Sequence, residues 1–236
     1  MTKSNIFNIL EDYFLYVGRS DIKTTSSTVN AIIEIHNSIE KSITVNLVSK
    51  INLNDSNEIN RKIDENIASL CSLNDNIKKI KQSISYFLSE ITDNMQQHAD
   101  TNFGYIYTKH NDIDNQIEII LADGGMSIYG SDIKANKFIE NIENSDILAV
   151  GIAKDGYSTK ERPEAENRGY GLSSNIKMIN KGLNGDFAIM SGNALYISSI
   201  DKLIELPEQL DWKGTLVLAI IPTDIPSTFS FYDYIK

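Results

Sequence analysis

The order of apolar and polar positions along the chain predicts a protein built from both helices and strands. In several stretches the apolar residues recur every three or four positions, which is typical of helices with one buried face. Shorter runs rich in β-branched residues and bounded by turn residues are typical of strands. The helical pattern covers residues 3–17, 28–40, 57–71, 77–99, 171–181 and one or two stretches within 131–154; the strand pattern covers 42–48, 103–108, 116–122, 187–190, 195–199 and 215–221.

These elements divide into a helix-rich N-terminal part and a C-terminal part in which helices and strands alternate. We therefore expect a boundary near residue 75, with an N-terminal extension over residues 1–75 and an α/β domain over residues 76–236. The pattern leaves open whether the extension forms a dimer contact, recognises a partner or adds layers to the core.

Composition and charge narrow the classes of function. The 236 residues carry a formal net charge of −10, which opposes binding to nucleic-acid phosphates. The single cysteine, Cys71, excludes an internal disulfide, and its apolar helical surroundings predict a buried, inert thiol. No apolar run is long enough to cross a bilayer, and Glu11 and Asp12 do not suit a signal peptide. We therefore expect a cytoplasmic protein that contacts neither nucleic acid nor membrane.

The helix expected over residues 77–99 aligns three polar side chains. Glu90, Asn94 and His98 are spaced four residues apart, so they form a row at the edge of the apolar face. Taken alone, such a row is more typical of a solvated helix edge than of a site. The apolar face itself consists of Ile84, Phe87, Leu88, Ile91 and Met95.

Three glycine-containing segments follow this helix. The first, Asp123-Gly124-Gly125, ends an apolar strand, and its glycines allow the backbone to approach a ligand closely. The second is Gly156-Tyr157-Ser158-Thr159-Lys160. The third, Arg168-Gly169-Tyr170-Gly171-Leu172, leads into a helix, and free N–H groups at a helix start suit a phosphate. Neither the dinucleotide-binding fingerprint nor the P-loop is present.

The order of these segments resembles the GHKL superfamily of ATP-binding proteins, which includes gyrase, histidine kinases and MutL. Glu90 to His98 resembles the N box, Asp123-Gly124-Gly125 the G1 box and Gly169-Tyr170-Gly171-Leu172 the G2 box. Lys213-Gly214-Thr215 resembles the final Gly-Thr element. The N box is most similar to that of anti-sigma-factor serine kinases, and the glycine segments to the lid of citrate- and fumarate-sensing histidine kinases.

The resemblance covers roughly residues 75–222 and implies a Bergerat-type fold. That fold is a two-layer α/β sandwich, with a mixed, mostly antiparallel sheet and helices on one face. The resemblance also implies ATP and Mg²⁺ as ligands.

At the adenine end, the resemblance assigns Asp123 as the acceptor for the adenine amino group. Gly125 would let the base approach, and Thr215 would support the same end of the nucleotide. Ser127 stands where the family has the last glycine of the G1 box, a departure that affects the hinge of the lid or a phosphate contact.

At the phosphate end, the resemblance assigns Asn94 as the Mg²⁺ ligand and Glu90 as the general base. His98 would lie near the phosphates, and a mobile lid would cover residues 127–168. The remaining binding positions implied by the resemblance are Ser158, Thr159, Lys160, Arg168, Gly169, Gly171 and Leu172.

Three functions remain open at this point. The first is an ATPase, releasing ADP, in which the ordered lid signals to a regulatory protein partner. The second is a serine or threonine protein kinase of the anti-sigma type, and the third is a non-catalytic nucleotide-binding scaffold. A homodimer is a further open alternative. Histidine autophosphorylation is not expected, because the surroundings of His36 do not match a phosphoacceptor box and His110 is expected at the surface.

Overall fold

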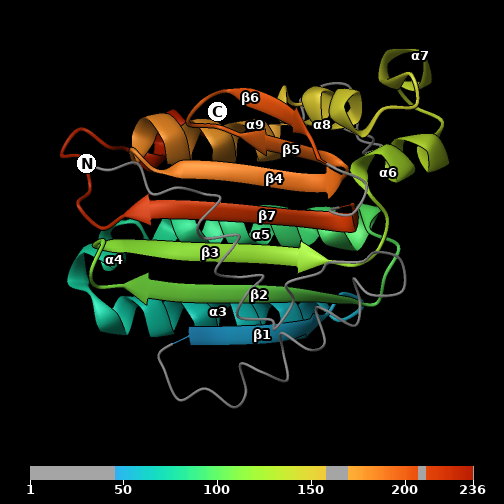
Figure 1. The fold of residues 1–236 in the computed structure, drawn as a ribbon. Coiled ribbons are helices and arrows are strands. Elements are labelled where there is room, and N and C mark those ends of the chain that lie inside the picture. Colours follow the sequence, from blue (N-terminus) through green and yellow to red (C-terminus); the bar gives the residue numbers. More distant parts are fainter. Residues whose placement is uncertain (1–45, 158–169, 207–210, 236) are drawn as a thin grey trace.

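The computed structural model, which describes residues 46–157, 170–206 and 211–235, is organised around a seven-stranded sheet (Figure 1). The strand order is β1-β2-β3-β7-β4-β5-β6, and every neighbouring pair among the described strands is antiparallel. The expected parallel component is therefore wrong for this part of the chain, because β7 returns through the middle of the sheet against both β3 and β4. The strands are β1 Asn46–Asn52, β2 Phe103–Asn111, β3 Gln116–Asp123, β4 Asp186–Gly192, β5 Ala194–Ile197, β6 Lys202–Glu205 and β7 Trp212–Pro222.

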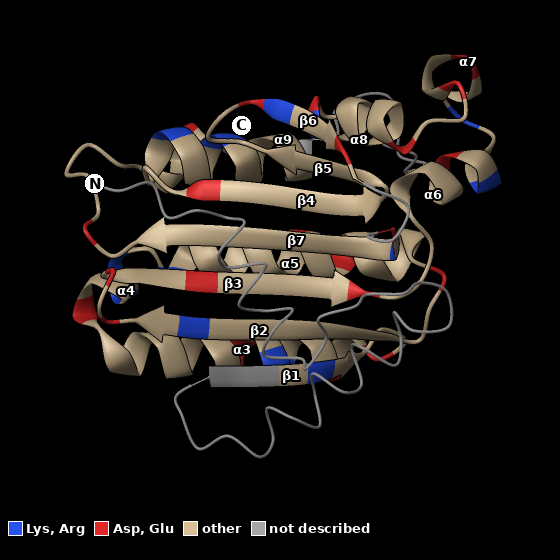
Figure 2. Cartoon of the chain, in the orientation of Figure 1, with Lys and Arg blue, Asp and Glu red and all other residues tan. Residues whose placement is uncertain are grey.

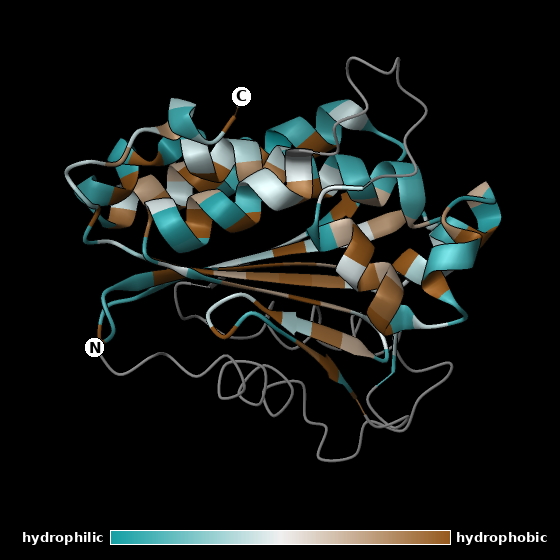
Figure 3. Ribbon diagram, turned by 90° about the horizontal axis from the view of Figure 1, so that it is seen from above, coloured by the Kyte–Doolittle hydropathy of each residue, from teal (hydrophilic) through white to brown (hydrophobic). Residues whose placement is uncertain are grey.

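The described helices cover one face of this sheet (Figures 1 and 3). The expected α/β class with helices on one side is thus confirmed for the described part of the chain. None of the described helices is both long enough and apolar enough to cross a membrane. The helices are α3 Ser56–Leu73, α4 Asp75–Lys79, α5 Lys81–His98, α6 Ile128–Ala135, α7 Ile139–Ile142, α8 Asp146–Lys154 and α9 Tyr170–Lys177, which continues as a π-helical turn over Met178–Gly182.

Local sequence sets where the first helices begin. The Asp55 side chain caps α3 by accepting hydrogen bonds from the N–H groups of Asn57 and Glu58. Asn74 caps α4 in the same way, and α4 ends at Lys79, with Ile80 between it and α5. The helix expected over residues 77–99 is therefore two helices joined at a tight turn.

The main core lies between the helices and the sheet. The face of α5 predicted to be apolar is buried, and Phe87 from this face meets Phe187 of β4 edge to face, with 6.3 Å between ring centroids. The same core contains residues of α3 such as Ile63 and Ile67, and Ile51 of β1. Residues 46–75 thus share one sheet and one core with the rest of the described chain, and no break in the core occurs near residue 75.

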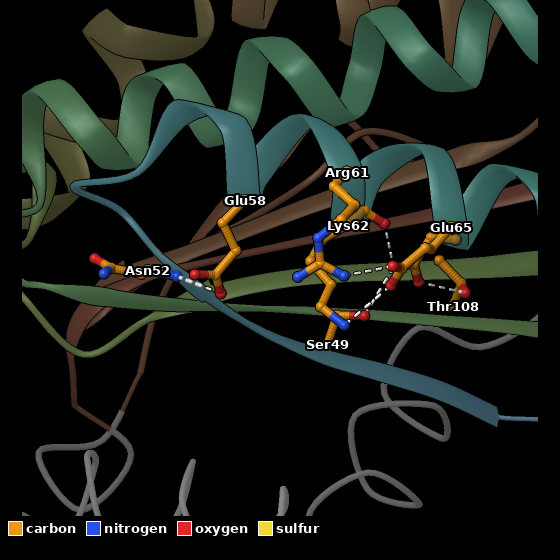
Figure 4. A network of polar contacts seen from close by, with 8 residues as sticks. Ser49, Asn52, Glu58, Arg61, Lys62, Glu65 and Thr108 are labelled. Atoms are coloured by element: carbon orange, nitrogen blue, oxygen red, sulfur yellow. Dashed lines mark hydrogen bonds and ion pairs between the residues drawn. The ribbon is translucent and has the colours of Figure 1, made fainter.

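A buried polar contact fixes α3 onto the sheet at Ser49 of β1 and Thr108 of β2 (Figure 4). The Asn66 side chain donates to Ser49 Oγ on β1 at 2.9 Å and accepts from Thr108 Oγ1 on β2 at 3.0 Å. It also donates to the Lys62 carbonyl at 2.8 Å. Because Asn66 is fully buried, these bonds set the position of α3 across the two strands.

Three further features differ from the sequence expectations. Cys71 is only partly buried, against the main core, and burial raises the pKa of its thiol. His110 lies in β2 with a buried side chain rather than in a surface turn, and its Nδ1 lies 2.9 Å from the Asp112 carboxylate. The short strand β6 was not predicted, because its four residues carry only a weak alternating pattern.

The aromatic C-terminal segment packs on its own chain. Phe229, Phe231 and Tyr234 lie partly buried against the main core, and Phe231 meets Tyr86 of α5 edge to face. Tyr232 remains exposed. Most of the segment's aromatic surface is therefore covered by the chain itself.

Candidate functional site

The polar row on α5 has the geometry that the sequence predicts. Glu90, Asn94 and His98 are partly exposed along one edge of the helix, beside the buried face. Asn94 lies one turn from each of the other two. The row ends at His98, the last residue of α5. The loop that follows β3 contacts the next residue, Ala99.

That loop is packed directly onto the end of α5. A Cβ atom on Gly125 would overlap the Ala99 carbonyl oxygen, and the next residue, Met126, donates its N–H to the same oxygen at 2.6 Å. A glycine is required here for close packing of two backbones. The contact with Ala99 accounts for the glycine by itself, and the approach of a base to Gly125 stays a prediction.

Asp123 ends β3 with a carboxylate that is almost completely buried, at 1% exposure of the residue. The carboxylate accepts hydrogen bonds from the backbone N–H of Gly125, at 3.0 Å, and of Thr215. Burial raises the pKa of Asp123 to about 7, and these two hydrogen bonds act in the opposite direction. No cation pairs with this carboxylate among the described residues.

The start of β7 encloses Asp123 from the other side. A Cβ atom on Gly214 would overlap the backbone and the carboxylate of Asp123, so only glycine fits there. The Trp212 indole donates to the Asp123 carbonyl at 3.0 Å. The structure therefore brings the G1-like loop and the Gly-Thr element together, as the sequence resemblance implies.

Ser191 is a member of this cluster that the sequence analysis missed. It is fully buried near the end of β4, and its hydroxyl lies 3.2 Å from Thr215 Oγ1 and 3.0 Å from the Gly214 carbonyl. It also accepts the N–H of Ile128 at 2.9 Å. The only signal in the sequence is one serine inside an apolar strand, which does not identify a partner.

Ser127, the residue in place of a family glycine, begins α6. Its side chain accepts from the Gly130 N–H at 3.1 Å, which makes it the N-cap of the helix. Its hydroxyl also lies 3.4 Å from the Asp146 carboxylate. The serine therefore has a structural function at the helix start that a glycine could not supply.

Asp146, in the first turn of α8, fixes that helix to the β4–β5 turn. Its carboxylate accepts the Asn193 N–H at 3.2 Å, and a side chain at Gly192, where φ is +58°, would overlap it. Burial raises the pKa of Asp146. Since Ala149 and Val150 of α8 are also buried, α8 is packed into the core although it falls within the range expected to form a mobile lid.

The first turn of α9 approaches Glu90 closely. A Cβ atom on Gly171 would overlap Glu90 Oε2, so this glycine leaves the space that the carboxylate occupies. The Asn175 side chain is fully buried and donates to the Gly171 carbonyl at 2.8 Å. Tyr86, one turn before Glu90, hydrogen bonds to the Ser174 side chain, and burial and the Glu90 charge raise the pKa of its phenol.

At the other end of the row, α6 contacts His98. The Ser131 hydroxyl lies 3.3 Å from His98 Nδ1, and Lys134 Nζ forms an exposed ion pair with Asp100 at 2.9 Å. Leu172 is partly buried against the main core. Five predicted binding positions, Ser158, Thr159, Lys160, Arg168 and Gly169, lie outside the described residues.

The cluster thus has two ends with different chemistry. At one end, the buried carboxylate of Asp123 accepts hydrogen bonds from backbone N–H groups. At the other, the carboxylate of Glu90 and the amide of Asn94 line α5 beside the first turn of α9. Within the described ranges, no three histidine, cysteine or acidic side chains group closely enough to hold a metal ion by themselves.

Comparison of the chain with protein-family models, with curated proteins and with solved structures gave no match.

Proposed function

We propose that this protein binds Mg·ATP in a Bergerat-type fold, with the adenine at Asp123 and the phosphates between α5 and α9. The observation that carries the proposal is the Asp123 carboxylate, which is buried at the end of a central strand and pairs with no cation of the described residues. A buried carboxylate with a strongly raised pKa is characteristic of functional sites. Its oxygen would accept the adenine amino group, with Thr215 and Ser191 completing the polar surroundings.

The arrangement of the remaining elements supports the same proposal. The described chain combines an antiparallel sheet that has helices on one face with the α5 row and with a glycine-containing start of α9 that lies against Glu90. The N–H groups of the first turn of α9, which lack partners within the helix itself, would bind phosphate oxygens, since helix N-termini favour negative charge. Gly171 and His98 lie at the two ends of this region.

The residues also fit a magnesium ion carried by the nucleotide. Mg²⁺ prefers oxygen ligands and is usually held by one or two protein groups together with phosphates and water. The Asn94 amide oxygen would supply a protein ligand, and Glu90 would orient the attacking water or hydroxyl.

We infer slow ATP hydrolysis that changes the arrangement of the lid and so signals to a protein partner. Because α8 is fixed by Asp146, Ala149 and Val150, this helix would not take part in the movement.

Equilibrium binding of ATP in the presence of Mg²⁺ tests the adenine assignment. Asp123→Asn removes a charge-assisted hydrogen bond, so affinity should fall by roughly 5- to 150-fold, equivalent to about 1–3 kcal/mol. Asp224→Asn, at an exposed position with the same change in charge, should bind like wild type. Absence of binding by the wild-type protein would contradict the proposal.

Following γ-labelled ATP tests the function of Glu90. Free labelled phosphate that disappears in Glu90→Ala, but not in the exposed control Glu140→Ala, would support hydrolysis. Label transferred to a partner protein would identify a kinase instead. Nucleotide binding without any movement of the label would identify a non-catalytic scaffold.

A further inference from the structure

The sheet has a second apolar face, opposite the helices. Along β7, residues 217, 219 and 221 belong to the main core, whereas the residues between them form a separate apolar cluster, which we call the second-face cluster. The face turned toward the viewer in Figure 1 carries no described helix, and the central strands carry few charged residues (Figure 2). The buried members are Ile120, Ala122, Ala188, Met190, Leu195, Ile197, Trp212, Leu216, Leu218 and Ile220.

These side chains are nearly inaccessible within a single chain. The ten buried members are at most 5% exposed, and Tyr105, Tyr107, Ile204 and Leu206 extend the second-face cluster from β2 to β6. Six neighbouring strands at the usual separation span roughly 24 Å. Since the described helices lie on the other face, they do not account for this burial (Figure 3).

The N-terminal 45 residues have the length, the attachment point and the pattern needed to cover this face. They lead directly into Asn46, the first residue of the edge strand β1. In residues 3–17 the apolar positions Ile6, Leu10, Phe14 and Val17 recur at helical spacing. A helix of that length would extend about 22 Å, which matches the width of the second-face cluster. The other undescribed segments are much shorter.

We propose that residues 1–45 form a third layer on the second face of the sheet, with the apolar stripe of residues 3–17 on the second-face cluster. The burial of the cluster within one chain favours this segment over a second copy of the protein as the occupant. The N-terminal segment is then part of the folded domain and not a free module for partner recognition.

The second-face cluster reaches Asp123 through one side chain. Trp212 belongs to the second-face cluster, and its indole N–H holds the Asp123 carbonyl at 3.0 Å. The N-terminal segment therefore supports the position of the carboxylate through one side chain. Trp212 is also the single tryptophan of the chain, so its fluorescence reports whether the second-face cluster is covered, without any added probe.

Energy transfer in the full chain tests the proposal without disturbing the contact. In a Cys71→Ser background, Asn8→Cys places a dansyl label on the polar side of the expected helix. The Trp212 emission should then be strongly reduced by transfer to the label at every protein concentration, and the reduction should vanish in denaturant. A folded, labelled chain without transfer would overturn the proposal. So would transfer lost on dilution, which would identify a second copy as the occupant.

A pair of charge substitutions provides an independent measurement. Leu10→Asp inserts a charge into the apolar stripe, so the Trp212 emission should shift to longer wavelength and be quenched more strongly by acrylamide. Asn8→Asp adds the same charge on the opposite side and should leave both quantities unchanged. Equal spectra and equal quenching for wild type and Leu10→Asp would also overturn the proposal.

Discussion

At the scale of single residues, two side chains have environments that the rest of the fold must maintain. Asp123 is an acid buried among backbone groups at the end of β3, and burial raises its pKa to about 7. Glu90 occupies space that only a glycine at position 171 leaves free. Both features can be tested by substitution, independently of any ligand.

Asp123→Asn should flatten the dependence of stability on pH. The pKa of Asp123 is about 7 in the fold, against about 3.9 for an aspartate in an unfolded chain. Folding therefore favours the protonated form, so the contribution to stability is complete below pH about 4 and is lost as the pH rises through about 7. Urea unfolding across this range measures the free energy of unfolding at each pH.

Asp132 provides the comparison for this measurement, because burial raises its pKa to about 7 as well. Asp132→Asn should remove the part of the pH dependence of the free energy of unfolding that Asp132 contributes. The two substitutions together should remove the contributions of both aspartates. A slope identical in wild type and Asp123→Asn would show that Asp123 titrates in the fold as it does in the unfolded chain.

Gly171→Ala should destabilise the protein by about 1–3 kcal/mol, the usual cost of forcing an extra carbon into a packed region. The added Cβ overlaps Glu90 Oε2, so Glu90 or α9 must move. In a Glu90→Ala background the space is free, and the same substitution should cost much less. Thermal unfolding of the four proteins in this cycle gives the coupling energy. An equal loss of stability with and without the Glu90 side chain would mean that overlap with Glu90 does not cause the destabilisation.

At the scale of elements, the helix layer is joined to the sheet by a few polar contacts in addition to the apolar core. Asn66 connects α3 to β1 and β2, Asp146 connects α8 to the β4–β5 turn, and Met126 connects the loop after β3 to the end of α5. Each contact uses a buried or partly buried group whose partner is distant in sequence. These contacts fix the register between helices and strands.

Asn66→Ala should lower the free energy of unfolding by about 2–4 kcal/mol. The substitution leaves a cavity and removes the partners of Ser49 and Thr108, both of which are buried. Asn60→Ala on the exposed side of α3 is the matched control and should change stability by no more than about 0.5 kcal/mol. Denaturant unfolding monitored by circular dichroism measures both, and similar losses for the two variants would contradict the importance of the Asn66 contacts.

At the scale of the whole molecule, the proposed nucleotide site draws on distant parts of the chain. Asp123 comes from β3, Thr215 from β7, Glu90 from α5 and Gly171 from α9. A ligand bound there would connect both halves of the sheet to the helix layer. Ligand binding should therefore stabilise the described fold as one cooperative unit.

Mg·ATP at about 100 times its dissociation constant should add about 2.7 kcal/mol to the stability. For a protein of this size the corresponding increase in Tm is roughly 5–11 °C. Glu90→Ala should keep this increase if Glu90 acts on turnover alone, and Asp123→Asn should reduce it at the same ATP concentration. An unchanged Tm at saturating Mg·ATP would contradict the proposed nucleotide site, and differential scanning calorimetry is the measurement.

The sequence by itself determined most of the described helices and strands, the buried face of α5 and the hairpin formed by β2 and β3, whereas the helices expected over residues 3–17 and 28–40 lie outside the described residues. These follow from local periodicity, which needs no knowledge of distant residues. It also identified the α5 row, the Gly-Thr element that the fold brings to Asp123, and the glycine segment at the start of α9 that it brings to Glu90. The row is confirmed as a line of partly exposed side chains, while its chemical function stays a prediction.

Only the tertiary structure decided the strand order, the purely antiparallel pairing of the described strands and the inclusion of β1 and α3 in the same core. Strand order depends on which distant segments pair, and local pattern carries no information about that choice. The functions of Ser191, Asp146 and Asn66 were missed for the same reason. Each is an ordinary polar residue in the sequence, and its importance arises from partners that only the folded chain brings within hydrogen-bonding distance.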